Sequence, residues 1–299
     1  MSVEIKTIGV VGAGQMGSGI AHVAAKSGYK VILNDISEEA LQRGLDSIRK
    51  SGLGSLKRKL QKGRISQEEY DVALVSKQEA NDAVLAQISG NTDMNALSGA
   101  ELIIEAATEN VALKNSIFEK LSSITADHVI LATNTSSISI TAIASHTNRP
   151  DKVVGMHFMN PVPVMKLVEL IRGLGTSDES YAAVEAVAQK MGKTTVEGRD
   201  MPGFIVNRIL MPYINEAVQA LYEGIGSVED IDVAMKLGTN VPMGPLTLAD
   251  FIGLDTCLAI MEVLHDGFKD SKYRPSPLLR KYVEAGWLGK KTKRGFYTY

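Results

Sequence analysis

A cluster of glycines near the start of the chain has the spacing of a phosphate-binding turn. Residues 12–17 read Gly-Ala-Gly-Gln-Met-Gly, which matches G-x-G-x-x-G, and the apolar run 8–11 before them predicts a strand that leads into a helix. Gly12 would permit the tight turn, Gly14 would let backbone amides approach a pyrophosphate, and Gly17 would let the helix pack close to the strand. An anion there would lie at a helix N-terminus, where unpaired amides and the helix dipole favour negative charge.

A second predicted strand, residues 30–35, ends in Asp35, 18 residues after Gly17. This carboxylate suits the two hydroxyls of a ribose and would repel a 2′-phosphate, so the pattern favours NAD over NADP. A glycine-rich turn beside a helix-capping aspartate is the alternative interpretation. FAD is a further alternative, although the sequence shows no second flavin motif.

His157 and Glu169 have the residue types of an acid–base pair. Oxidation of an alcohol by hydride removal releases a hydroxyl proton, which a neutral imidazole accepts near pH 7. His157 ends the predicted strand 153–158, and ligands of open α/β sheets bind at the carboxyl ends of strands. Glu169 is a lone acid in an apolar strand and needs a partner when buried. The pair predicts a carboxylate that orients the imidazole, and a structurally satisfied core pair is the alternative.

The other four histidines have less favourable positions. His22 lies in the first helix, towards the core or the cofactor, and His128 precedes a strand at the edge away from the ligand. His146 ends a short predicted helix, and His265 lies near a helix end late in the chain. None of the four follows the carboxyl end of a strand.

Two further polar features interrupt apolar patterns. Residues 134–137 read Asn-Thr-Ser-Ser after a predicted strand, so Ser136 would lie at the ligand edge, unless the segment only caps a helix. Asn207 interrupts the apolar face of residues 204–210, and a buried amide needs a partner. It would reach either the active-site cleft or a neighbouring helix.

The surrounding pattern predicts two domains. Strand and helix alternation over residues 1–199 predicts an α/β domain with a doubly wound, mostly parallel sheet, and residues 200–299 predict a smaller all-helical domain. The strands are expected near 5–11, 30–35, 102–105, 129–134, 153–158, 167–171 and 194–196, and the late helices near 204–222, 228–237, 246–264 and 275–285. Residues 37–86 are too long for one crossover and predict a projection of two helices. Asp200 is a candidate cap for a helix that begins at Pro202.

Composition excludes several classes of protein. The 299 residues include 32 basic and 34 acidic side chains, so neither a nucleic-acid partner nor an acidic disordered chain is expected. One cysteine, Cys257, excludes an internal disulfide and a multi-cysteine metal site, and we expect no metal. No apolar run is long enough to cross a membrane. The first residues resemble neither a signal nor a transit peptide, so we expect a cytoplasmic protein.

The motifs GAGQMG, NTSS, GMHFMNPVPVMKLVE, DMPGFIVNR and GKKTKRGFYTY together resemble the L-3-hydroxyacyl-CoA dehydrogenases, most closely their 3-hydroxybutyryl-CoA branch. The resemblance covers essentially the whole chain. It implies a Rossmann-type N-terminal domain, a C-terminal domain that forms a homodimer, and NAD-linked interconversion of 3-hydroxyacyl-CoA and 3-ketoacyl-CoA.

The resemblance also implies roles for single residues. His157 is the implied base, oriented by Glu169, while Ser136 and Asn207 contact the substrate. The implied contacts of NAD are Gly12, Gly14, Gln15, Met16, Gly17, Asp35, Glu109, Lys114, Ser136, Asn160 and Lys291.

Residues 43–64 hold eight basic side chains and one acid, which predicts a basic surface on the projection. The phosphates of an acyl-CoA would be attracted to such a surface, and the resemblance makes Ser55 and Lys62 the implied contacts. A merely solvated basic helix face is the alternative. A dehydrogenase of free hydroxy or sugar acids, or a catalytically silent NAD-binding protein, would fit the rest of the pattern.

Overall fold

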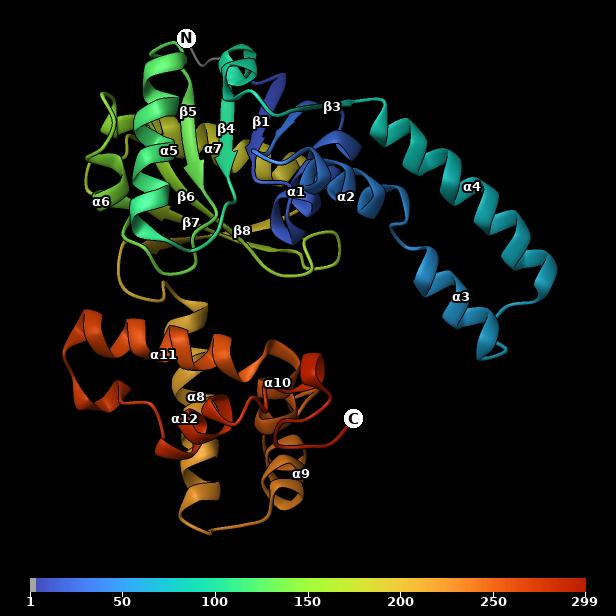
Figure 1. Ribbon diagram of the computed structural model, residues 1–299, viewed down its shortest axis with the longest axis vertical. Helices are drawn as coiled ribbons and strands as arrows, with labels where there is room; N and C mark the ends of the chain where they lie inside the picture. Colours follow the sequence, from blue (N-terminus) through green and yellow to red (C-terminus); the bar gives the residue numbers. More distant parts are fainter. Residues whose placement is uncertain (1–3) are drawn as a thin grey trace. The chain divides into compact units, whose positions relative to one another are not determined.

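The computed structural model describes residues 4–299, which divide into two compact units (Figure 1). The first unit ends at Asp200, and the second spans Met201–Tyr299. We describe each unit by itself. No helix in the described range has both the length and the apolarity needed to cross a membrane.

The first unit is built on an eight-stranded sheet in the order β3-β2-β1-β4-β5-β6-β7-β8. Neighbouring strands from β3 to β6 pair in parallel, β7 runs antiparallel to β6, and β8 is parallel to β7. This confirms the mostly parallel, doubly wound sheet. The strands are β1 (Thr7–Val11), β2 (Lys30–Asn34), β3 (Ile88–Asn91), β4 (Leu102–Glu105), β5 (Ile130–Thr133), β6 (Val153–Phe158), β7 (Leu167–Arg172) and β8 (Thr194–Arg199).

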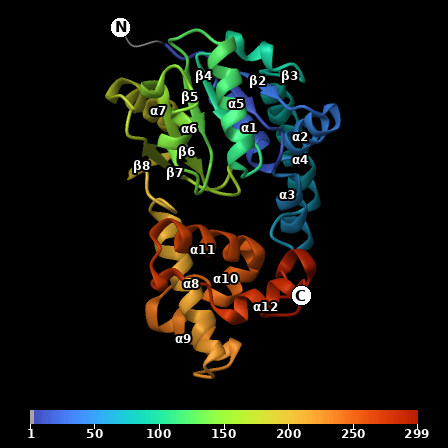
Figure 2. The ribbon, with the colours of Figure 1, turned by 60° about the vertical axis from the view of Figure 1, so that its left-hand side comes forward.

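Helices cover both faces of this sheet (Figure 2). Residues of α1 (Gln15–Lys26) and α7 (Asp178–Lys190) share one core cluster with alternate strand residues such as Ile8 and Val10. The opposite face meets α6 (Ile140–Ala144), whose Ile140 fills the space beside Gly155, and α5 (Val111–Ile124). Short 3-10 turns connect these elements at Met94–Gly99 and Pro150–Lys152.

The projection contains three helices rather than the expected two. They are α2 (Glu38–Arg49), α3 (Leu53–Gln61) and α4 (Gln67–Leu85). Gly52, with a left-handed φ of 79°, is the N-cap of α3 and separates it from α2. The Asn81 amide of α4 donates to the carbonyls of Arg49 (2.8 Å) and Ser51 (3.0 Å), which fixes the base of the projection, whereas α3 buries none of its residues.

The strand β3 was not among the strands expected from the sequence. Residues 88–91, Ile-Ser-Gly-Asn, form β3 at the edge of the sheet beside β2. Three of these four residues are exposed, so the segment lacks the apolar run by which a buried strand is detected. The edge strand β8 likewise continues past residue 196 to Arg199, because its outer residues need no apolar side chain.

The second unit is helical, as expected. Its helices are α8 (Val206–Tyr222), α9 (Val228–Thr239), α10 (Pro245–Ile252), α11 (Leu254–Phe268) and α12 (Pro277–Glu284), with 3-10 turns at Ser271–Tyr273 and Lys290–Thr292. The predicted single helix 246–264 is two helices, because Gly253 has a φ of 105° that no helix accommodates. The last residues form isolated bridges between Gly289, Arg294 and Thr298 instead of a strand.

Asp200 caps a different helix from the one expected. Its carboxylate accepts hydrogen bonds from the backbone amides of Ile140 (2.9 Å) and Thr141 (2.8 Å) and from the Ser139 hydroxyl (2.8 Å). The carboxylate thus satisfies the N-terminus of α6, some 60 residues earlier in the chain. Helix α8 starts only at Val206, after a turn.

Candidate active site

The turn between β1 and α1 forms a cradle for an anion. Gly12 has a φ of 97°, and its amide donates to the Asn34 carbonyl (2.8 Å), which holds the turn against β2. A Cβ on Gly17 would lie 1.8 Å from the Gly12 carbonyl oxygen, so only glycine lets α1 start this close to the strand. Gly14 has open space at its Cβ position, and α1 has no side-chain cap. The cradle therefore fits the pyrophosphate of a dinucleotide.

Asp35 lies beside this cradle, directly after β2. Its Oδ2 accepts a hydrogen bond from the Ala13 amide (2.8 Å), and its Oδ1 accepts one from the Ser37 amide (3.1 Å). Each carboxylate oxygen has a second acceptor position, and the side chain is only half-buried. The carboxylate of Asp35 is therefore placed to accept hydrogen bonds from ribose hydroxyls, the role expected from the sequence.

His157 and Glu169 face each other across β6 and β7. The register of this antiparallel pair places them directly opposite. Met156 and Phe158 belong to the core cluster that contains α1 and α7, so strand alternation turns His157 to the face of α6. His157 Nδ1 lies 2.7 Å from Glu169 Oε2, with the imidazole 9% exposed and the carboxylate fully buried. Because a carboxylate only accepts, the neutral imidazole carries its proton on Nδ1 and its basic lone pair on Nε2.

Glu109 holds the Asn-Thr-Ser-Ser segment in place. Its Oε1 accepts hydrogen bonds from the Thr135 hydroxyl (2.6 Å), the Ser136 amide (2.9 Å) and the Ser137 amide (3.1 Å), and both serine hydroxyls lie 3.1 Å away. Burial raises the pKa of Glu109, but the Thr135 hydrogen bond, the Lys114 ammonium and the hydrogen bonds from Ser136 and Ser137 together outweigh it, so the pKa lies below its usual value. Glu109 is therefore ionised at neutral pH and fixes Ser136 at the carboxyl end of β5.

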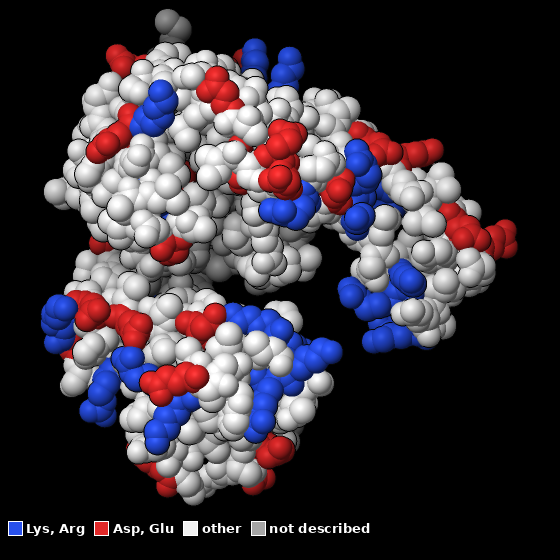
Figure 3. Space-filling view, viewed as in Figure 1, with Lys and Arg blue, Asp and Glu red and all other residues white. Residues whose placement is uncertain are grey.

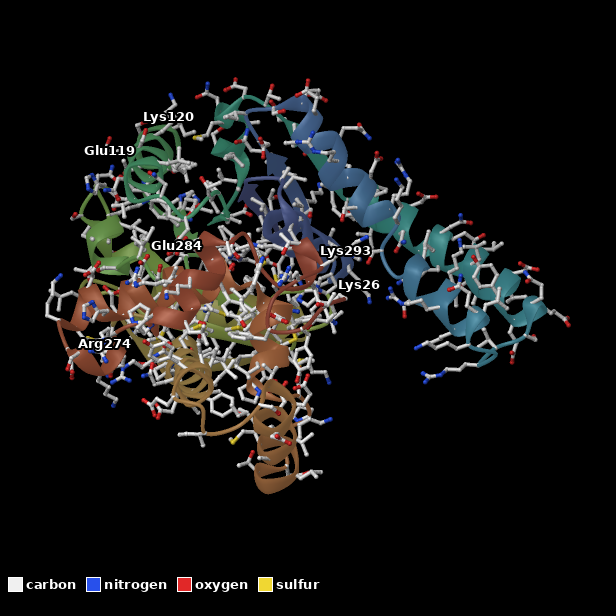
Figure 4. All side chains as sticks on the ribbon, turned by 60° about the horizontal axis from the view of Figure 1, so that its bottom comes forward. Lys26, Glu119, Lys120, Arg274, Glu284 and Lys293 are labelled. Carbon is white, nitrogen blue, oxygen red and sulfur yellow. The ribbon has the colours of Figure 1, made fainter. Side chains whose placement is uncertain are left out.

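Lys114 is buried beneath this turn. Its ammonium lies 2.7 Å from Glu105 Oε1 and 3.6 Å from Glu109 Oε2, and only 1% of its side chain is exposed. Glu119 and Lys120, on the same helix α5, lie on its outer surface (Figure 4). The Lys114 ammonium thus contacts the carboxylates of both Glu105 and Glu109.

Asn160 joins the loop after β6 to the glycine turn. Its Oδ1 accepts a hydrogen bond from Gln15 Nε2 (3.0 Å). A pocket of about 210 Å³ lies here; its lining includes Gln15, Ser18, His22, Ser47, Ser51, Asn160 and Val162. Burial, assisted by Lys26 and Lys77, lowers the pKa of His22 to about 4. His22 is thus a neutral packing residue beside the cofactor turn, in agreement with its predicted place.

The remaining histidines do not follow the carboxyl end of a strand within the described residues. His128 precedes β5 at the amino edge. His146 follows α6, with its Nδ1 2.8 Å from Glu119 Oε1. His265 lies in the last turn of α11.

The implied acyl-CoA contacts lie on the projection. Ser55 and Lys62 are exposed on α3 and at its C-cap, among basic side chains that gather at this end of the projection (Figure 3). Ser47 and Ser51, which line the pocket at the base of the projection, were not among the sequence candidates. Small polar residues on an amphipathic helix carry no signal that separates a pocket wall from a solvated face.

The second unit holds two of the implied residues. Asn207 is the second residue of α8 and is buried, and its neighbour Arg208 stacks over the rings of Phe268 (4.9 Å) and Tyr273 (4.5 Å). The Lys291 ammonium lies 2.5 Å from the Asp255 carboxylate and is about half exposed.

Sequence reasoning gave no individual role to three residues that organise the site, although two of them, Asn134 and Thr135, belong to the segment 134–137 that it singled out. Glu105 binds Lys114, Asn134 Oδ1 accepts a hydrogen bond from the Phe158 amide (2.9 Å), and Thr135 binds Glu109. Glu105 had a usable signal, because it ends the apolar run Leu-Ile-Ile in the same way that Glu169 interrupts its own strand. Within residues 4–299, no group of three or more His, Cys, Asp or Glu side chains is arranged to hold a metal ion.

Known proteins match this chain over nearly its whole length. Residues 7–201 match a sequence model for the NAD-binding domain of 3-hydroxyacyl-CoA dehydrogenase, and residues 203–299 match its C-terminal domain. The chain is 55% identical over 296 residues to a probable 3-hydroxybutyryl-CoA dehydrogenase of Bacillus subtilis, covering 99% of this chain and 98% of the relative. It is 52% identical over 299 residues to a 3-hydroxybutyryl-CoA dehydrogenase of Bradyrhizobium diazoefficiens, covering 100% and 97%. The crystal structure of (S)-3-hydroxybutyryl-CoA dehydrogenase PaaH1 from Ralstonia eutropha superposes with a TM-score of 0.88 at 50% identity, covering 99% of both chains.

Proposed function

This chain belongs to the 3-hydroxyacyl-CoA dehydrogenase family, and from that premise we propose that it interconverts (S)-3-hydroxybutyryl-CoA and its 3-ketoacyl-CoA with NAD as cofactor. The observation that carries the proposal is the 2.7 Å contact between His157 and Glu169 at the carboxyl edge of the sheet that also bears the glycine cradle. Full-length relatives at 50–55% identity carry the same activity in their names.

The proposed chemistry is a proton transfer coupled to a hydride transfer. In the oxidation direction, His157 Nε2 accepts the proton of the C3 hydroxyl as the C3–O bond becomes a carbonyl. The glycine turn would hold NAD, whose nicotinamide would supply the acceptor for the hydride from C3. The buried Glu169 carboxylate stabilises the imidazolium that forms and keeps its ring oriented. In the reverse direction, the imidazolium polarises the ketone and returns the proton.

Ser136 and Asn207 are proposed to hold the substrate. Ser136 follows β5, the strand that pairs with β6, so its hydroxyl lies at the same edge as the imidazole. We assign it and Asn207 to the reacting oxygen and the thioester carbonyl. Holding the reacting atoms close to the base supplies orientation, which lowers the barrier without new chemistry.

The cofactor is proposed to bind along the cradle. Gly12, Gly14 and Gly17 admit the pyrophosphate, Asp35 takes the ribose hydroxyls, and the remaining contacts come from Gln15, Met16, Glu109, Asn160 and Lys291. Lys114 contributes through Glu109. The Asp35 carboxylate also disfavours a 2′-phosphate by charge repulsion, which supports NAD over NADP.

The CoA moiety is proposed to bind at the projection. Basic side chains at the α3 end suit phosphate groups, with Ser55 and Lys62 as implied contacts, and the pocket lined by Ser47 and Ser51 opens beside Gln15. These features favour a CoA thioester over a free hydroxy acid.

The oligomeric state and the cellular role are proposed from the same family membership. We propose that the second unit forms a homodimer, because it exposes large apolar side chains on α8, α9 and α10 and in the turn between α8 and α9, namely Ile209, Tyr222, Ile225, Val233, Leu237 and Phe251. A cytoplasmic role in fatty acid or butanoate metabolism fits this activity.

A substrate comparison tests the proposal. NADH oxidation is followed by absorbance with acetoacetyl-CoA and with free acetoacetate at equal concentrations, and NADPH replaces NADH in a parallel series. We expect rapid turnover of acetoacetyl-CoA with NADH only. A faster rate with free acetoacetate, or no oxidation of NADH at all, would contradict the proposal.

A further inference from the structure

We infer that Glu105 is a positioning residue of the cofactor site, which holds Lys114 and Thr133 and through them sets the place of Glu109 and of the Ser136 segment. Glu105 is the last residue of β4, at the carboxyl edge of the sheet. The inference rests on the NAD site proposed above and adds a residue to which that proposal gives no role.

The first observation is that both oxygens of the Glu105 carboxylate accept hydrogen bonds. Oε1 accepts hydrogen bonds from the Lys114 ammonium (2.7 Å) and the Ala107 amide (2.7 Å), and Oε2 accepts one from the Thr133 hydroxyl (2.7 Å). The side chain has no exposed surface. The geometry follows from the sheet, because the β4–β5 register places Glu105 opposite Thr133 and alternation turns both to the face of α5.

The second observation is that both contacts continue to the proposed site. Through Lys114, the ammonium that binds Glu105 lies 3.6 Å from Glu109 Oε2, and Glu109 in turn binds the Ser136 and Ser137 amides. Through Thr133, the Oγ1 atom accepts a hydrogen bond from the Thr135 amide (3.2 Å), and Thr135 binds Glu109 as well. One carboxylate therefore fixes two sides of the same turn.

The stability of the fold alone does not explain why Glu105 and Lys114 form a buried ion pair. Removing two charges from water costs about as much as their attraction returns, and a buried ion pair can often be replaced by apolar side chains without loss. Lys114 and Glu105 are 1% and 0% exposed, so this cost applies in full. The pair is instead explained by the second contact of the Lys114 ammonium, which holds the Glu109 carboxylate in place against the Ser136 segment.

The test compares two glutamates of the same strand region. Glu105→Gln keeps the shape but removes the charge, and Glu101→Gln is the matched control. Glu101 accepts hydrogen bonds from the Lys6 and Thr7 amides (3.1 and 2.7 Å) at the amino edge of the sheet. It therefore also connects two chain segments, but it lies away from the proposed NAD site. NADH affinity is measured by fluorescence titration, alongside thermal unfolding and the kcat and KM for acetoacetyl-CoA.

We expect Glu105→Gln to weaken NADH binding about tenfold, as coupled contacts of this kind do, while Glu101→Gln changes unfolding only. Thr133→Val removes the hydroxyl that links Glu105 to the Thr135 amide, and it changes no charge. Because this link positions the Ser136 segment, we expect the variant to lower kcat more than it weakens NADH binding. A folded Glu105→Gln protein with wild-type NADH affinity and kcat would overturn the inference.

A second variant separates positioning from stability. Glu105→Gln/Lys114→Met removes both charges, so we expect its unfolding temperature to rise above that of Glu105→Gln while NADH affinity stays low. Recovery of NADH affinity together with stability would show a purely structural role and overturn the inference. Failure of the wild-type protein to bind NADH would instead refute the proposed cofactor site, which separates the two failures.

Discussion

His157 and Glu169 lie directly opposite each other on β6 and β7, with Nδ1 and Oε2 2.7 Å apart and both side chains almost fully buried. The antiparallel arrangement of β7 creates this relationship. In a parallel pair the two strands would need a long crossover, whereas here a loop of eight residues, 159–166, connects them. The base and the carboxylate that orients it are thus held by one hairpin.

His157→Ala should lower kcat by about 10²–10⁴-fold, the usual contribution of a positioned acid–base group. NADH binding should persist, because the imidazole lies outside the glycine cradle. The measurements are steady-state kinetics with acetoacetyl-CoA and an NADH titration. His128→Ala, at the amino edge of the sheet, is the control and should retain wild-type kcat. A His157→Ala enzyme with a near-normal rate would remove the proposed mechanism.

Glu169→Gln should also lower kcat, but less than the loss of the imidazole. The amide preserves the shape, yet it neither stabilises the imidazolium nor enforces the Nδ1 proton as strongly. Steady-state kinetics and an NADH titration check the cause, because a glutamate that acts on the imidazole should change kcat while NADH affinity stays at its wild-type value. Wild-type kcat would show that Glu169 does not act on His157.

Gly14→Ala should weaken NADH binding without reducing stability. The added Cβ meets no protein atom within 4 Å, so the only group it obstructs is the bound pyrophosphate. Thermal unfolding and NADH titration separate the two effects, and Gly54→Ala on α3, where nothing lies within 4 Å either, is the control. Gly17→Ala should by contrast destabilise the fold, since its Cβ would lie 1.8 Å from the Gly12 carbonyl oxygen. Wild-type NADH affinity in Gly14→Ala would place the pyrophosphate elsewhere.

His22 should make the folded protein less stable in mild acid. Burial, with Lys26 and Lys77, lowers its native pKa from 6.5 to about 4. Between these values the unfolded chain binds a proton that the native protein does not, so stability falls as the pH decreases from 6.5 to 4 and this contribution levels off below 4. Urea unfolding across this range should show a shallower decline for His22→Leu. An identical decline in both proteins would contradict the buried, neutral imidazole.

The sequence by itself determined the chemistry and much of the fold. The spacing of Gly12, Gly14 and Gly17, with Asp35 after the next strand, identified the nucleotide turn, because these positions need specific backbone freedom or a specific charge. Long apolar or periodic segments such as 153–158 and 204–222 predicted their elements closely, because burial imposes a repeating pattern on them. Exposed segments impose no such pattern, so β3 and the break between α2 and α3 were missed.

Only the tertiary structure decided which side chains meet. Glu105 and Thr133 are 28 residues apart, and Asp200 and Ile140 are 60 apart; their contacts depend on strand register and chain path, which no local pattern encodes. The resemblance implies Lys114 as a cofactor contact, and the structure shows its buried ammonium between the carboxylates of Glu105 and Glu109. Local sequence fixes which groups are available, but the free energy of burial, summed over the whole sheet and its helices, determines which of them become partners.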